Sequence, residues 1–236
     1  AAVLVGVLRA RAEAGRRTVW IALLAAVVLV VQVILGGLTV LELLAEWTVT
    51  SHLLAGNTFC MLLLLLSLSL REAHTTVDRT PISWAARSMG LGLGGVVVAQ
   101  LALGGLVSSS YAGLACGTWP TCDGTSWFPT FQGLVGLQLM HRLLAYGVLV
   151  ASGVAWAMAR TSPRAGRAAA VVFVAVLFQA TIGVANVLLR LPVEVTLLHS
   201  FGAAGVWLST AYLNWELLRA PVPADVPVAS AELEVA

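Results

Sequence analysis

Six long apolar segments constrain the fold of this chain more than any other feature. They cover residues 19–44, 49–70, 84–108, 131–159, 168–189 and 195–218. A helix needs about 20 predominantly apolar residues to cross a bilayer, and each segment reaches that length. Only 10% of the 236 residues are charged, whereas a soluble domain carries about 25%. The sequence therefore predicts an all-α polytopic membrane protein with six transmembrane helices.

The basic residues indicate how the chain is oriented. All 13 are arginines, and eleven of them flank the same side of the predicted spans. The other two, Arg142 and Arg190, fall on the opposite side. Basic loops remain in the cytoplasm, so the loops 45–48, 109–130 and 190–194 are expected to be extracytoplasmic. We therefore expect a multi-pass protein of the bacterial cytoplasmic membrane.

An internal repeat relates two parts of the chain. The segment QVILGGLTVLELLAEWTVTSHLL at 32–54 aligns without gaps on QATIGVANVLLRLPVEVTLLHSF at 179–201, displaced by 147 residues. The alignment pairs Gln32 with Gln179, Gly36 with Gly183, and His52 with His199. A shorter match relates QLALGGL at 100–106 to QVILGGL at 32–38. Both copies keep the same sidedness, which predicts a parallel repeat with its axis along the membrane normal.

The same displacement predicts what lies at the start of the chain. The mate of His141 would precede Ala1, so AAVLVGVLRA corresponds to the tail of the helix that carries His141. We expect the chain to begin inside a helix and to lack two helices of an eight-helix architecture with two pseudo-repeated four-helix bundles. The expected parts are a remnant of the N-terminal half at 1–83, the complete C-terminal half at 84–219, and a disordered cytoplasmic tail at 220–236.

Three of the four histidines lie in predicted spans, near their extracytoplasmic ends: His52, His141 and His199. Ionisable side chains are costly in a bilayer and usually have a function there. Two imidazoles on facing helices can hold a haem iron between them. A zinc site would need further ligands, and none is evident near His141 and His199. Haem ligation by this pair is favoured, with interhelical hydrogen bonding and another metal as alternatives.

Arg142 directly follows His141 at the outer end of the same span. A guanidinium group is the preferred bidentate partner of a carboxylate, so Arg142 could bind a haem propionate. It could instead extend to the membrane interface, as long basic side chains near helix ends commonly do.

The chain has three cysteines, two of which lie in the predicted outer loop. Cys116 and Cys122 are close in sequence and on the oxidising side, which favours a disulfide. A free catalytic thiol pair is the alternative. The third cysteine, Cys60, lies within the second span and is expected to be a buried structural thiol.

Four stretches together resemble the heme A synthase family. They are LGGLTVL and WTVTSHLLAG within 35–56, GLACGTWPTCDG at 113–124, QLMHRLLAY at 138–146, and IGVANVLLRLPVEVTLLHSFGA at 182–203. The resemblance implies an eight-helix membrane oxidoreductase that oxidises the C8 methyl group of haem O to the formyl group of haem A. It also implies that His141 and His199 bind a haem b cofactor, that His52 serves the substrate haem, and that Cys116 and Cys122 are the family's outer cysteine pair.

One residue of the family pattern has no counterpart in this chain. The catalytic glutamate precedes the first N-terminal histidine by three residues, in a region that is absent, and Gln138 occupies the equivalent place in the C-terminal half. The implied partners are haem O, haem A, membrane lipid, and a haem O synthase or terminal oxidase assembly proteins, without nucleic acid. Two other functions are weighed: a bis-histidine haem b cytochrome that only transfers electrons, and a non-enzymatic membrane assembly partner.

Overall fold

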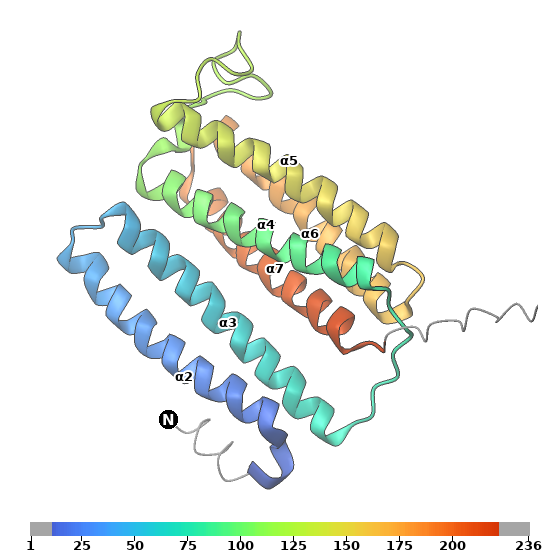
Figure 1. Cartoon of the computed structure of the whole chain (residues 1–236). Coiled ribbons are helices and arrows are strands. Elements are labelled where there is room, and N and C mark those ends of the chain that lie inside the picture. The colour runs from blue at the N-terminus through green and yellow to red at the C-terminus, as the bar shows by residue number, and fades with distance from the viewer. Residues whose placement is uncertain (1–10, 222–236) are drawn as a thin grey trace, which may run out of the picture.

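The computed structural model describes residues 11–221, which form helices and no strand. The helices are α2 (Arg11–Leu41), α3 (Glu46–His74), α4 (Trp84–Ser109), the 3₁₀ turn η1 (Ala112–Leu114), α5 (Gly133–Ala159), α6 (Pro163–Leu188) and α7 (Val193–Arg219) (Figure 1). Helices α2 to α6 are long and apolar enough to cross a membrane. This result confirms the all-α polytopic fold class. The sequence at 1–10 and beyond residue 221, for which a helix tail and a disordered tail were predicted, lies outside the described residues.

Helix α7 corresponds to the sixth predicted span. It has 27 residues, enough to cross a bilayer, but it is not among the helices that are also apolar enough. Glu194, His199 and Asn214 interrupt its apolar sequence. Its length and its packing in the bundle suit a span, and its membrane crossing stays a prediction.

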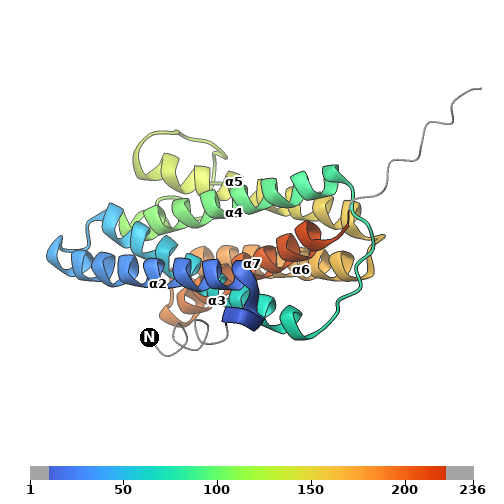
Figure 2. The ribbon, with the colours of Figure 1, turned by 60° about the horizontal axis from the view of Figure 1, so that its bottom comes forward.

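Helices α4, α5, α6 and α7 form a bundle of two layers (Figure 2). Both α4 and α6 pack on α5 and on α7, so α5 and α7 occupy diagonally opposite corners. The α2–α3 hairpin lies beside this bundle, where α3 contacts α4 and α7, and α2 packs on α3 (Figure 1). The centre of the bundle is filled by buried apolar side chains from all four helices, including Leu93, Val148, Val172 and Leu213.

Local sequence explains several helix boundaries. The Ser83 side chain accepts a hydrogen bond from the Ala86 amide at the start of α4, which satisfies one of the free N–H groups there. Pro163 is the first residue of α6, where its missing N–H and restricted φ suit a helix start. Gly15 has a φ of 70°, and this left-handed residue bends α2 near its beginning.

The internal repeat is visible in the α2–α3 and α6–α7 hairpins. Their first helices end at Leu41 and Leu188, and their second helices begin at Glu46 and Val193, so both boundaries differ by 147 residues. The turns between them place matching residues in the left-handed region: Leu43 and Leu44 in one hairpin, Arg190 and Leu191 in the other. The two copies therefore share the geometry of their turn as well as their sequence.

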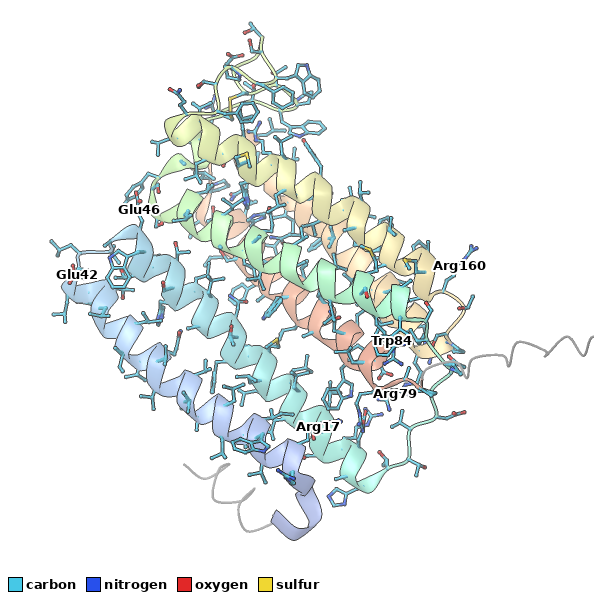
Figure 3. The ribbon with its side chains drawn as sticks, in the orientation of Figure 1. Arg17, Glu42, Glu46, Arg79, Trp84 and Arg160 are labelled. Atoms are coloured by element: carbon cyan, nitrogen blue, oxygen red, sulfur yellow. A yellow bond between two sulfur atoms is a disulfide. The ribbon has the colours of Figure 1, made fainter. Side chains whose placement is uncertain are left out.

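Charged side chains lie near the two ends of the molecule, and most of the arginines lie at one of them. Glu42 and Glu46 flank the α2–α3 turn, whereas Arg17, Arg79 and Arg160 lie at the opposite end (Figure 3). This separation is what the positive-inside rule requires of a membrane protein whose arginine-rich end faces the cytoplasm.

An ion-pair cluster joins the hairpin to the bundle at the arginine-rich end. Glu216 of α7 is 2% exposed and accepts hydrogen bonds from Arg79 Nε at 3.0 Å and from Arg164 Nη2 at 2.9 Å. Arg79 also pairs with Glu72 of α3. Arg219 donates to the same Glu72 carboxylate at 2.9 Å. Because each carboxylate is met by two guanidinium groups, the cluster satisfies its buried charges.

The prediction for Cys60 is wrong, because its side chain is exposed on α3. An apolar residue that faces lipid costs no more than one in a protein interior, so an apolar helix does not reveal which of its faces is covered. The exposed Trp20, Val27, Val30 and Val33 of α2 illustrate the same point.

Candidate cofactor-binding site

The three histidines of the predicted spans lie at one depth of the molecule. His52 and His199 are each six residues into α3 and α7, and His141 is eight residues into α5. These helices all begin at the end opposite the arginine-rich one, so each histidine lies about two turns from that end. All three side chains are partly buried.

A glutamine on the preceding helix contacts each histidine. Gln32, Gln100 and Gln179 each lie nine residues before the last residue of α2, α4 and α6. Gln100 Nε2 lies 3.2 Å from His141 Nδ1 and donates to the His141 carbonyl oxygen at 3.1 Å. Gln179 Nε2 has the same two contacts with His199, at 3.2 Å and 2.8 Å.

A glycine one turn after each glutamine makes room for the imidazole ring. A Cβ atom would lie 3.2 Å from His141 Cε1 if added to Gly104, and 3.0 Å from His199 Cε1 if added to Gly183. A Cβ atom on Gly36 would likewise lie 3.0 Å from His52 Cε1. Glutamine, glycine and histidine thus form a three-residue unit that occurs three times in the described structure.

The His52 unit differs from the other two in its hydrogen bond. Gln32 Nε2 lies 3.2 Å from His52 Nε2, so it contacts the ring nitrogen opposite the one used at His141 and His199. The Nδ1 atom of His52 is buried and has no hydrogen-bond partner in the part of the chain that the structure describes. His52 therefore differs from His141 and His199 in the ring nitrogen that its glutamine contacts. The repeat nevertheless makes His52 and His199 equivalent in sequence.

His141 and His199 are the two histidines of the described four-helix bundle, and they lie on different helices. They lie at similar depth on α5 and α7, which are diagonal across the four-helix bundle. Their Nδ1 atoms contact glutamines, and their Nε2 atoms take part in no hydrogen bond to the described protein. Among residues 11–221, no three His, Cys, Asp or Glu side chains gather as a metal cluster, so a multi-ligand zinc site is not formed there. This donor set fits an iron that brings its own macrocycle.

The outer loop between α4 and α5 is closed by the predicted disulfide. Cys116 and Cys122 are bonded, with their Cα atoms 4.3 Å apart, and both are buried. In the same loop the amides of Ser126 and Thr125 donate to Asp123 and hold the pKa of that exposed carboxyl below its usual value. The disulfide prediction is confirmed.

Arg142 binds the same loop. Its Nη1 donates to the Thr118 carbonyl oxygen at 3.0 Å, and its Nη2 donates to the Cys116 carbonyl oxygen. The guanidinium thus joins α5, one residue from His141, to the disulfide loop. Gln138, one turn earlier on α5, makes a second link because its Nε2 donates to the Gly113 carbonyl oxygen at 3.2 Å.

Sequence reasoning singled out the histidines but assigned no role to Gln100 and Gln179. The signal was present, because QLALG, QVILG and QATIG share a glutamine four residues before a glycine. This spacing places the glutamine and the glycine on the same face of a helix. The interhelical contact that gives them a role could be read only from the structure.

Comparisons with known proteins agree with the resemblance noted in the sequence. The COX15-CtaA family model, described as cytochrome oxidase assembly protein, matches residues 1–211. The chain is 37% identical over 139 residues to a heme A synthase of Methylobacterium nodulans, which covers 52% of this chain and 39% of that protein.

Two further relatives match over a longer part of the chain. A heme A synthase of Brucella anthropi is 30% identical over 202 residues, covering 78% of this chain and 54% of that protein. A heme A synthase of Shewanella oneidensis is 29% identical over 218 residues, covering 78% of this chain and 62% of that protein. The chain thus spans 39% to 62% of the length of these curated relatives. With a family model that covers residues 1–211, this multi-pass membrane chain belongs to the heme A synthase family, COX15-CtaA.

Proposed function

We propose that this chain is the haem-binding part of a membrane oxidoreductase that oxidises the C8 methyl group of haem O to the formyl group of haem A. The observation that carries the proposal is the pair His141 and His199, which lie at similar depth on diagonal helices with Nε2 atoms unused by the described protein. The relatives named heme A synthase support the choice of reaction.

The proposed cofactor is haem b, held within residues 84–219 by His141 and His199. When bound, this haem supplies one-electron chemistry. The protein contributes the two imidazole ligands and, at Gly104 and Gly183, the space that the rings need. The surrounding apolar helices keep water away from the iron.

Arg142 is proposed to contribute in two ways. Its contacts with loop carbonyl oxygens hold the disulfide loop beside the helix that carries His141. A guanidinium has five N–H donors, and those that the loop does not use are proposed to bind a haem propionate.

His52 is proposed to serve the substrate haem, in the half of the protein that includes residues 1–83. Its ring lies against Gly36, and its Nδ1 is buried without a partner. An iron with only one strong imidazole ligand keeps a position free for oxygen chemistry, whereas a bis-histidine iron does not.

The proposed location is the bacterial cytoplasmic membrane, with the histidines and the disulfide toward the extracytoplasmic side. The arginines at the opposite end support this orientation. The proposed partners are haem O, haem A, and a haem O synthase or terminal oxidase assembly proteins.

Purification of the protein, followed by a reduced-minus-oxidised spectrum, tests the haem b assignment. We expect a low-spin haem b spectrum that His199→Ala and His141→Ala each abolish, because either change removes one of the two residues that would bind the iron. His74→Ala is the matched control, since His74 is exposed at the far end of α3 and its loss should leave the spectrum unchanged. Protein without any haem band would instead favour a non-enzymatic assembly partner.

The reaction itself is tested with His52→Ala in the full-length protein, whose haems are extracted and separated by chromatography. We expect this variant to keep the haem b spectrum but to lose conversion of haem O to haem A. Normal haem A output would make His52 an interhelical hydrogen-bonding residue. A wild-type protein that holds haem b and never produces haem A would be an electron-transfer cytochrome.

A further inference from the structure

We propose that Gln100 and Gln179 are positioning residues that set the proton on the two ligand histidines. In this proposal the carboxamide of each glutamine is oriented so that Oε1 accepts the Nδ1–H of the histidine whose Nε2 binds iron. The inference rests on the proposed haem b site and adds to it a specific role for two side chains that bind no iron.

The first observation is the contact between each glutamine and its histidine. Nε2 of a carboxamide can only donate, and in both units it lies 3.2 Å from the Nδ1 atom of the histidine. Nδ1 therefore accepts. A neutral imidazole that accepts at Nδ1 carries its proton on Nε2 and has no lone pair there for a metal. With this carboxamide orientation His141 and His199 would carry the proton on Nε2, whereas ligation through Nε2 requires the proton on Nδ1.

The second observation is an unused acceptor beside each histidine. The Oε1 atoms of Gln100 and Gln179 are buried and have no hydrogen-bond partner among residues 11–221. A buried acceptor without a partner is destabilising, so an arrangement that supplies a donor is favoured. The Nδ1–H of a histidine that ligates through Nε2 is such a donor, and metal-bound histidines nearly always direct it to an acceptor.

A half-turn of the carboxamide connects the two arrangements. Its oxygen and nitrogen ends have nearly the same size and differ mainly in hydrogen bonding, so exchanging them needs no other side chain to move. After this half-turn, Nε2 of each glutamine no longer donates to the carbonyl oxygen of His141 or His199. Those carbonyls lie inside α5 and α7, where helix amides also bond them.

The carboxamide of Gln179 lies close to Gly202 of α7. A Cβ atom on Gly202 would lie 2.2 Å from Gln179 Oε1. Any side chain larger than that of glycine would therefore displace the amide, and with it the hydrogen bond to His199.

Gln32 provides an internal comparison. It occupies the same place in the repeat as Gln179, but its Nε2 contacts Nε2 of His52 and leaves Nδ1 of His52 unpartnered. Gln32 thus does not contact the ring nitrogen that the proposal assigns to Gln100 and Gln179. The role proposed for Gln100 and Gln179 therefore follows from the contact that each makes and not from its position in the repeat.

The test measures the midpoint potential of haem b in the full-length protein for Gln179→Glu and Gln179→Met. A carboxylate accepts Nδ1–H more strongly, makes the imidazole more electron-rich and stabilises ferric iron, so the potential should fall. Methionine has no such acceptor, so the potential should rise. We expect each shift to reach about tenfold in the reduction equilibrium, which is ~59 mV for one electron. The corresponding variants of Gln32 should leave the haem b potential unchanged.

Opposite signs for the two substitutions are the result that a packing role would not produce. Shifts of the same sign, or haem b with an unaltered potential in both variants, would overturn the inference while leaving the haem site intact. A wild-type protein without haem b would overturn the proposed function as well. If Gln179→Glu retains no haem, the Gln100→Glu and Gln100→Met pair on α4 must show the opposite shifts, and failure there would also overturn the inference.

Discussion

At the scale of single residues, the geometry of the site depends on its glycines as well as on its histidines. An imidazole ring lies against Gly36, Gly104 and Gly183 at distances that leave almost no room for a methyl group. Each glycine lowers the intrinsic stability of its helix by about 1 kcal/mol relative to alanine. Their recurrence beside the three histidines is explained by the close approach of the ring, which an added methyl group would crowd.

Gly183→Ala should weaken haem b binding. The added Cβ would lie 3.0 Å from His199 Cε1 and push the ring from its place. Overpacking of this kind costs about 1–3 kcal/mol, so affinity should fall roughly tenfold. The haem-to-protein ratio, measured by absorbance during haem titration, checks this result. Gly205→Ala on α7 is the control, because nothing lies within 4 Å of its Cβ. Equal affinities of both variants would contradict the role of Gly183.

Arg142→Met should loosen the disulfide loop. The change removes donors to the Cys116 and Thr118 carbonyl oxygens, and hydrogen bonds from a charged group contribute about 1.5–3 kcal/mol. We expect faster proteolysis within residues 110–132. Mass spectrometry of the fragments measures the rate and the site of cleavage. Arg142→Lys should restore little protection, because an ammonium group lacks the planar fork of the guanidinium. Arg160→Met, at the opposite end of the molecule, is the control. Equal rates of loop proteolysis in the Arg142→Met and Arg160→Met variants would argue against the contact between Arg142 and the loop.

Pairs of helices are the units that the molecule repeats. The α2–α3 and α6–α7 hairpins share their boundaries and their left-handed turn residues, yet their surroundings differ. The α6–α7 pair lies within the four-helix bundle, and the α2–α3 pair lies beside it. At the arginine-rich end, Glu72 of α3 and Glu216 of α7 share Arg79, which joins the two pairs.

Glu216→Gln should destabilise the contact between these hairpins. The change leaves Arg79 and Arg164 without the buried carboxylate that both contact. Removing one member of a buried ion pair costs about 3–5 kcal/mol. Thermal unfolding in detergent should therefore show a clearly lower midpoint. Glu194→Gln, an exposed change in the first turn of α7, should cost no more than about 1 kcal/mol. Similar midpoints for both variants would mean that the cluster contributes little.

For the molecule as a whole, the two ends have different chemistry. One end carries the histidines and the disulfide loop, and the other carries the ion-pair cluster. Glu42 and Glu46 lie at the first end, and Arg17, Arg79 and Arg160 lie at the second (Figure 3). This asymmetry sets the expected direction of insertion, because cytoplasmic loops retain the excess of basic residues.

Labelling of single introduced cysteines checks the orientation in intact cells. In a Cys60→Ala background, Trp127→Cys in the outer loop should react with a membrane-impermeant maleimide. Asp78→Cys, in the linker between α3 and α4, should react only after the cells are opened. Both positions are exposed, so a difference in reactivity reports the side of the membrane. The reverse pattern would invert the proposed topology.

The same labelling reagents test the disulfide. Cys116 and Cys122 should stay unlabelled until the protein is reduced, since both sulfur atoms are bonded. Cys60, exposed on α3, provides the internal reference for a reactive thiol in denatured protein. Labelling of Cys116 and Cys122 without reduction would contradict the bond.

Much of this architecture follows from the amino-acid sequence alone. The apolar segments, the repeat, the similar depth of His52, His141 and His199, and the closeness of Cys116 and Cys122 are all local properties of spacing and composition. A membrane strengthens such inferences because every span must satisfy its own backbone hydrogen bonds, which leaves the helix as the solution for an apolar segment of this length.

Contacts between helices required the folded molecule. Gln100 and His141 are 41 residues apart, and their meeting depends on how α4 packs against α5. Helical periodicity shows which side chains share a face but not which helix that face meets. In a bilayer this gap is wider, because lipid and protein are equally apolar and a lipid-facing surface resembles a packed one. For that reason the sequence could identify the histidines, whereas packing alone revealed the glutamine at each ring, the loop contacts of Arg142 and the exposure of Cys60.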